Sequence, residues 1–226
     1  MTNHANHICT NHTNANQGNT KQANITTNSI DSSFFVGKRI GFALTGSFCT
    51  LDAALEIIKT LVGLGADILP IVSHAVDTTD TTFGTASDIK KRLETACGKP
   101  AVNTITGAEP IGPKKLLDIL VILPATGNTL AKIALGITDT SVTMAAKAHL
   151  RNNRPVLLGI SSNDALSGGA KNIGQLLGMR NIYFVPFGQD MPHQKPRSMV
   201  FCKDFALAAI AEALEGQQLQ PMLYQA

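Results

Sequence analysis

Short runs of aliphatic residues alternate with segments of helical period along most of this chain of 226 residues. Runs of this kind are typical of parallel strands that helices cover on both faces. Five runs follow Gly37, at residues 40–45, 68–73, 119–123, 155–160 and 182–186. The alternation predicts a single doubly wound α/β domain, flavodoxin-like or Rossmann-like, whose mostly parallel sheet is flanked by helices.

The segments between these runs carry apolar residues three and four positions apart. In residues 51–64, Leu51, Leu55 and Ile58 share one stripe, as in an amphipathic helix that packs on a sheet. Further helices are predicted at residues 129–137, 141–150, 172–177 and 203–214. Asp139 precedes the second of these helices and is predicted to be its N-cap.

Residues 1–33 have a different composition from the rest of the chain. They are rich in Asn and Thr, carry formal charge only at Lys21 and Asp31, and show no apolar period. Such a segment cannot bury enough apolar surface to fold. We therefore expect a disordered N-terminal tail, followed by one α/β domain over residues 34–226.

The balance of charge and the length of the apolar runs argue against two classes of partner. The chain has 19 Lys and Arg residues against 16 Asp and Glu residues, which is too even for a nucleic-acid-binding surface. Its apolar runs are far shorter than the roughly 20 residues of a membrane span, and we expect no signal peptide. We predict a cytoplasmic protein that binds neither nucleic acid nor membrane.

The residues that follow the strands are the candidates for ligand binding, because ligands of doubly wound sheets bind at the carboxyl ends of the strands. The first run is followed by Gly46 and Ser47, in a turn that opens a helix and so presents backbone N–H groups to a phosphate. The second run ends at Ser73 and is followed by His74. A dinucleotide-binding fold has a carboxylate for the ribose at this place, and this chain has none. The GxGxxG fingerprint is absent as well. The turn therefore predicts a phosphate site in a chain that has no NAD site of its own.

The third run is followed by the letters PATGNT at residues 124–129. This stretch resembles the PASANT motif of the homo-oligomeric flavin-containing Cys decarboxylase family. The family pattern continues as K-x-A-x-G-x-x-D, which Lys132, Ala134, Gly136 and Asp139 match. The resemblance implies FMN at a subunit junction of a trimer, with its ring against this loop and its phosphate at the first Gly-Ser turn.

The same resemblance assigns roles to particular residues of this chain. It implies that FMN binds to Gly46, Ser47, Ser73, Thr126, Gly127, Asn128 and Thr129. Two family features are missing: Pro110 stands where the decarboxylases have their catalytic histidine, and only Asn163 is retained from their PxMN substrate motif. These departures weigh against an FMN-dependent decarboxylase, which stays open as an alternative.

Three other stretches, at residues 107–114, 144–165 and 186–199, resemble the family of dipicolinate synthase B subunits. That resemblance implies one subunit of an oxidoreductase that works during sporulation. Its partner would be the A subunit of the same synthase, which holds NADP, and its substrate a tetrahydrodipicolinate-type dicarboxylate. The resemblance also implies a homo-oligomer, such as a trimer. A non-catalytic scaffold or binding subunit that keeps the same fold is the second alternative.

A dicarboxylate substrate requires fixed cations. Lys195 and Arg197, in a proline-stiffened segment after the last run, are the predicted carboxylate clamp, and Asn163 is predicted to bind substrate with them. Glu109 and Lys114 are the acid/base candidates, expected at the mouth of the third strand, because oxidation to an aromatic ring removes C–H protons. No metal site is predicted.

Two histidines have more than one interpretation. His74 is either a proton acceptor at neutral pH or a strand-end side chain bonded to backbone. His149, on the helix predicted at residues 141–150, is expected on the surface or at an interface.

Overall fold

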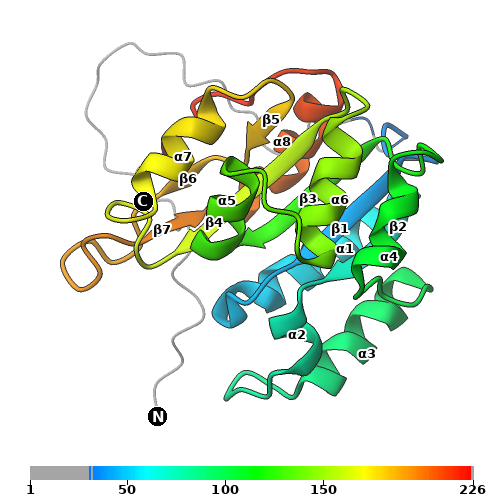
Figure 1. Ribbon diagram of the computed structural model, residues 1–226, viewed down its shortest axis with the longest axis horizontal. Coiled ribbons are helices and arrows are strands. Elements are labelled where there is room, and N and C mark those ends of the chain that lie inside the picture. Colours follow the sequence, from blue (N-terminus) through cyan, green and yellow to red (C-terminus); the bar gives the residue numbers. More distant parts are fainter. Residues whose placement is uncertain (1–30, 32, 225–226) are drawn as a thin grey trace.

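A computed structural model describes Asp31 and residues 33–224 of the chain. Five parallel strands form the body of its sheet (Figure 1): β1 (Arg39–Leu44), β2 (Asp67–Val72), β3 (Ile119–Ala125), β4 (Val156–Ser162) and β5 (Ile182–Phe184). They lie in the order β2-β1-β3-β4-β5, and each pairs in parallel with its neighbour. This is the flavodoxin-like strand order, so the predicted fold class and its five parallel strands are confirmed.

Two short strands were not predicted. β6 (Phe187–Gly188) and β7 (Met199–Phe201) pair with each other antiparallel, and β7 also pairs antiparallel with the end of β4. Strands of two and three residues are too short to show a period of their own. Their pairing makes the sheet mixed and brings the segment between them to the carboxyl end of β4.

The helices cover both faces of the sheet (Figure 1). Their bounds are α1 (Leu51–Gly63), α2 (His74–Thr78), α3 (Ala86–Cys97), α4 (Ile105–Ala108), α5 (Gly127–Ala134), α6 (Ser141–Leu150), α7 (Ala170–Leu177) and α8 (Ala206–Leu214), with short 3-10 helices η2 (Phe48–Thr50), η3 (Glu109–Ile111) and η4 (Lys203–Phe205). The predicted helices form, with shifted ends in several cases, whereas α2, α3 and α4 were not predicted. In α3 only Ala86, Ile89 and Leu93 are buried, which is a weak apolar stripe.

The N-cap of α6 differs from the prediction. Thr140, and not Asp139, accepts a hydrogen bond from the backbone N–H of Thr143, and the Thr143 hydroxyl accepts one from the backbone N–H of Thr140. Because this reciprocal pair already satisfies the helix start, Asp139 is left to pair elsewhere.

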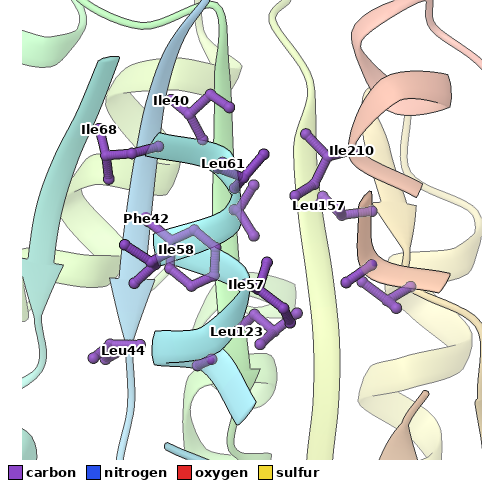
Figure 2. Packing of buried hydrophobic residues seen from close by; sticks show 14 of the residues in the cluster. Ile40, Phe42, Leu44, Ile57, Ile58, Leu61, Ile68, Leu123, Leu157 and Ile210 are labelled. Atoms are coloured by element: carbon purple, nitrogen blue, oxygen red, sulfur yellow. The ribbon is translucent and has the colours of Figure 1, made fainter. Parts of the chain in front are cut away.

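Two apolar clusters hold the helices to the sheet. On one face α1 and α8 pack on the central strands, and on the other face α5, α6 and α7 do so. Figure 2 shows Ile58 and Leu61 of α1 against Ile40 and Phe42 of β1. Each of these side chains is fully buried, and burial of such a side chain stabilises the fold by about 1.5–3 kcal/mol.

The predicted tail, residues 1–33, lies outside the described residues except for Asp31 and Ser33, so its disorder and the domain boundary stay predictions. Among the described residues, none of the helices is long and apolar enough to cross a membrane.

Candidate functional site

The ends of β1 and β3 are joined by one buried side chain, Thr45. Its hydroxyl donates to the carbonyl oxygen of Pro124 at 2.8 Å and accepts from the backbone N–H of Thr126 at 3.0 Å. The chain turns to β2 on one side of β1 and to β3 on the other, so this is the switch point at which such sheets bind ligands. Sequence reasoning did not select Thr45, although a hydroxyl at the end of a buried apolar run was a signal for it.

A cavity of about 900 Å³ opens beside this junction, and we call it the first cavity. Five of the predicted cofactor residues line it: Gly46, Ser73, Thr126, Asn128 and Thr129. They come from the ends of three different strands, which the parallel sheet places at one edge. The loop before α4 and the start of α6 complete the wall.

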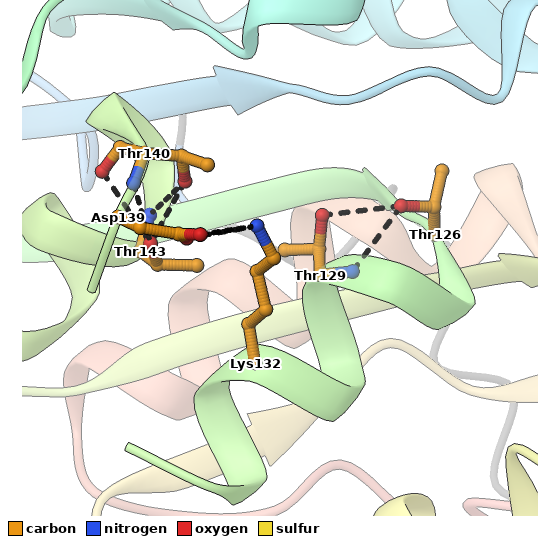
Figure 3. A network of polar contacts seen from close by, with 6 residues as sticks. All are labelled: Thr126, Thr129, Lys132, Asp139, Thr140 and Thr143. Atoms are coloured by element: carbon orange, nitrogen blue, oxygen red, sulfur yellow. Dashed lines mark hydrogen bonds and ion pairs between the residues drawn. The ribbon is translucent and has the colours of Figure 1, made fainter. Parts of the chain in front are cut away.

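A polar network stiffens the wall of the first cavity (Figure 3). Thr126 caps α5 by accepting from the backbone N–H of Thr129, and the two hydroxyls lie 3.1 Å apart. One turn further, the Lys132 ammonium donates to both carboxylate oxygens of Asp139 at 2.8 and 2.9 Å. These bonds hold the pKa of Asp139 below its usual value. The two motif residues therefore form an ion pair in the wall of the cavity, in which the carboxylate balances the ammonium charge.

A second cavity of about 430 Å³ lies on the other side of Gly46 and Thr126, which line both. The remaining predicted cofactor residues, Ser47 and Gly127, line this second cavity and not the first. The Ser47 hydroxyl lies 2.7 Å from that of Ser161 at the end of β4. The seven residues that the sequence placed around one cofactor are thus divided between two adjacent cavities.

Gly127 begins α5 at a place with no room for a side chain. A Cβ atom there would lie 2.8 Å from the Ser162 hydroxyl and 2.9 Å from a carboxylate oxygen of Asp164. The Ser162 hydroxyl itself donates to Asp164. The absence of a side chain at Gly127 therefore lets the β4–α7 loop approach the start of α5.

The predicted substrate residues are only partly brought together. Asn163 and Lys195 line the second cavity. Arg197 does not; its side chain is exposed, and its carbonyl oxygen accepts from the backbone N–H of Leu166 at 2.9 Å. The Lys195 ammonium is 3.3 Å from a carboxylate oxygen of Asp190. The two cations therefore do not converge on one ligand within this chain.

The acid/base candidates lie away from both cavities. Glu109 and Lys114 are exposed and line neither. They precede β3, and the neighbouring Lys115 carbonyl accepts from the Arg39 guanidinium at the amino end of β1. The prediction placed the pair at the mouth of the third strand, where the strand ends, whereas the chain passes through them before the strand begins.

The two histidines differ in burial. His74 is exposed at the start of α2 and lines the first cavity, and its carbonyl accepts from the Thr78 hydroxyl. His149 is buried within the chain, so its expected place on the surface or at an interface is wrong. Its Nε2 atom has no hydrogen-bond partner among the described residues. Burial, together with the charge of Arg154, lowers the pKa of His149 to about 4.

The described residues contain no group of three or more His, Cys, Asp and Glu side chains suited to a metal ion.

Comparison with known proteins gives a consistent group of relatives. A family model described as Flavoprotein matches residues 29–215. The dipicolinate synthase B subunit of Bacillus subtilis is 50% identical over 187 residues, which cover 83% of this chain and 94% of that protein.

Solved structures agree with that comparison. The crystal structure of the dipicolinate synthase B subunit from Bacillus halodurans superposes with a TM-score of 0.78 at 48% identity, covering 84% of this chain and 98% of that chain. The FMN-dependent cysteine decarboxylase SpaF superposes with a TM-score of 0.59 at 24% identity, covering 80% of this chain and 97% of that chain. At that identity the second likeness shows the fold alone.

Proposed function

Because this chain belongs to the flavoprotein family, we propose that it acts as the B subunit of a dipicolinate synthase and holds FMN in the first cavity. The observation that carries the cofactor assignment is the cavity at the junction of β1 and β3 that Thr45 holds together. The relative that shares half of its residues with this chain supports the assignment of the reaction.

The donors around the first cavity fit FMN. A phosphate is matched by the backbone after β1 and by Ser73, and a flavin ring by the Thr126 to Thr129 loop. At Gly46 a Cβ atom would lie 3.2 Å from the Cβ of Ala75, so the bare backbone keeps this wall open. Lys132, held by Asp139, places N–H donors in the same wall. When bound, FMN supplies a ring that accepts and returns electrons.

The remaining parts of the proposal concern partners and substrate. NADP is assigned to the partner chain, the A subunit of the synthase, because this chain lacks the glycine fingerprint of a dinucleotide site. The substrate is a tetrahydrodipicolinate-type dicarboxylate, and the chain forms a homo-oligomer such as a trimer. The two-subunit name of the relatives supports a partner chain.

The cofactor is tested by the visible absorption spectrum of the purified chain and by titration with FMN. Ser73→Asp should weaken FMN binding about tenfold or more, because a second negative charge repels the phosphate. Ser73 caps α2 by accepting from the N–H of Val76, and Asp is an equally good N-cap, so the fold is retained. Ser47→Asp, in the second cavity, should have a smaller effect.

Thr85→Asp is the matched control, because Thr85 caps α3 in the same way and lines neither cavity. A purified chain that carries no flavin and does not quench the fluorescence of added FMN would refute the cofactor assignment. If such a colourless chain, mixed with the A subunit, still supported dipicolinate formation, a non-catalytic scaffold function would replace the proposed flavin-binding function. A larger effect of Ser47→Asp than of Ser73→Asp would show that the phosphate binds in the second cavity.

A further inference from the structure

The second cavity contains an ion pair that is incompletely satisfied. Asp190 lies between β6 and β7, and its Oδ2 atom is 3.3 Å from the Lys195 ammonium. That is longer than the roughly 2.7–2.9 Å of a close charge-assisted hydrogen bond. The Oδ1 atom of Asp190 is buried and has no partner among the described residues. A buried carboxylate oxygen without a donor is costly, so this pair is incomplete as it stands.

The charges around the second cavity do not suit a ligand that carries two negative charges and no hydrogen-bond donor. Among its described lining residues Lys195 is the cation, and two carboxylates, Asp164 and Asp190, line the cavity with it. Asp164 already accepts from the Ser162 hydroxyl. A ligand carboxylate that binds Lys195 competes with Asp190 for the N–H donors of the ammonium. Asp190, which lines the cavity and already has one oxygen without a partner, would then be satisfied by a donor on the ligand.

The segment that carries this pair is held in shape by its own bonds. The Gln189 side chain donates to the carbonyl of Pro196 at 2.9 Å, and the backbone N–H of Lys195 donates to the carbonyl of Met191 at 2.7 Å. The pair is therefore presented to the cavity by a preorganised segment, which reduces the entropy lost when a ligand binds.

We propose that Asp190 is a specificity-determining residue that accepts a hydrogen bond from an N–H or O–H group of a ligand whose carboxylate binds Lys195. The ligand class is then an imino, amino or hydroxy acid. Dipicolinate has an aromatic nitrogen without hydrogen and ionised carboxylates, so it offers Asp190 no donor. The site therefore prefers a saturated, donor-bearing ring acid to the aromatic product. The choice of ring skeleton rests on the proposed function.

The experiment is a calorimetric titration of the full chain, with and without FMN, by two ring dicarboxylates. One is dipicolinate, and the other is the saturated piperidine dicarboxylate of the same skeleton, which carries N–H donors. The unaltered chain should bind the saturated acid about tenfold more tightly or better. Asp190→Ala should abolish that preference and strengthen dipicolinate binding, because it removes the acceptor and leaves Lys195 free. Asp190→Val, which also removes the acceptor and the charge, should abolish the preference as a second variant.

Asp204→Asn is the control, because Asp204 is exposed in η4 and lines neither cavity. Its preference should equal that of the unaltered chain. Equal binding of the two acids, no binding of either, or an unchanged preference in both Asp190 variants would overturn the proposal. The titration needs neither the A subunit nor turnover, so its failure leaves the flavin test of the proposed function standing.

Discussion

At the scale of single residues, the site depends on positions where small or hydroxyl side chains let backbones meet. Thr45 satisfies the carbonyl and N–H groups at the ends of β1 and β3. Gly127 admits the Ser162 and Asp164 side chains to the start of α5. Neither residue has to touch a ligand to matter, because each holds the walls of a cavity in register.

Gly127→Ala should destabilise the fold by about 1–3 kcal/mol, because the new Cβ forces the Ser162 and Asp164 side chains to move. Gly174→Ala on α7 is the matched control. Nothing lies within 4 Å of a Cβ at Gly174, and alanine in a helix should stabilise by about 0.5–1 kcal/mol. Urea unfolding of the two variants measures both effects. Equal stability of the two would contradict the crowding seen at Gly127.

At the scale of elements, α6 carries the buried His149. The pKa of this imidazole falls from 6.5 to about 4, first because burial disfavours the charged form and then because Arg154 lies near. The folded state therefore keeps His149 neutral where the unfolded chain already binds a proton. Its contribution to stability is present above pH 6.5 and is lost as the pH falls from 6.5 toward 4.

His149→Leu should flatten the loss of unfolding free energy over that pH window, which is about 3 kcal/mol for a shift of this size. Asp118, near Arg154, does not mask the effect, because the Arg39 guanidinium lowers its pKa below the window. The exposed His193 supplies the control, His193→Leu, which should keep the original slope. Chemical denaturation at several pH values gives the curves. A slope unchanged by His149→Leu would show that another group titrates there.

At the scale of the whole molecule, the strand order β2-β1-β3-β4-β5 opens both cavities at one edge of the sheet. The β6–β7 pair extends that edge beyond β4. The proposed division of labour follows from this layout, because both cavities are lined by hydroxyl-bearing turns and neither includes a dinucleotide fingerprint.

We expect the isolated chain neither to bind NADP nor to form dipicolinate. Its mixture with the A subunit should bind NADP and form dipicolinate. The reason is that the glycine turn and the ribose carboxylate of a dinucleotide site are absent from this sequence. Fluorescence titration with NADP and an absorbance assay for dipicolinate measure the two properties. Tight NADP binding by this chain alone would refute the division of labour between two chains and favour a single-chain dehydrogenase.

Sequence alone determined the features that depend on local periodicity. Continuous apolar runs identified the five parallel strands, and the stripe of Leu51, Leu55 and Ile58 identified α1, because burial on two faces or on one leaves a period in the chain. The short β6 and β7 and the weakly apolar α3 left no such period. Motif spacing also located the turns that line the cavities.

Only the tertiary structure decided which of those turns face one another. It divided Ser47 from Ser73 between two cavities and left Arg197 and Lys114 outside both. It also paired Asp190 with Lys195 and buried His149. These outcomes depend on strand order, on the β4–β7 pairing and on side-chain direction, which are long-range properties. Residue type and spacing report burial along the chain, whereas convergence on a ligand is set by packing between elements.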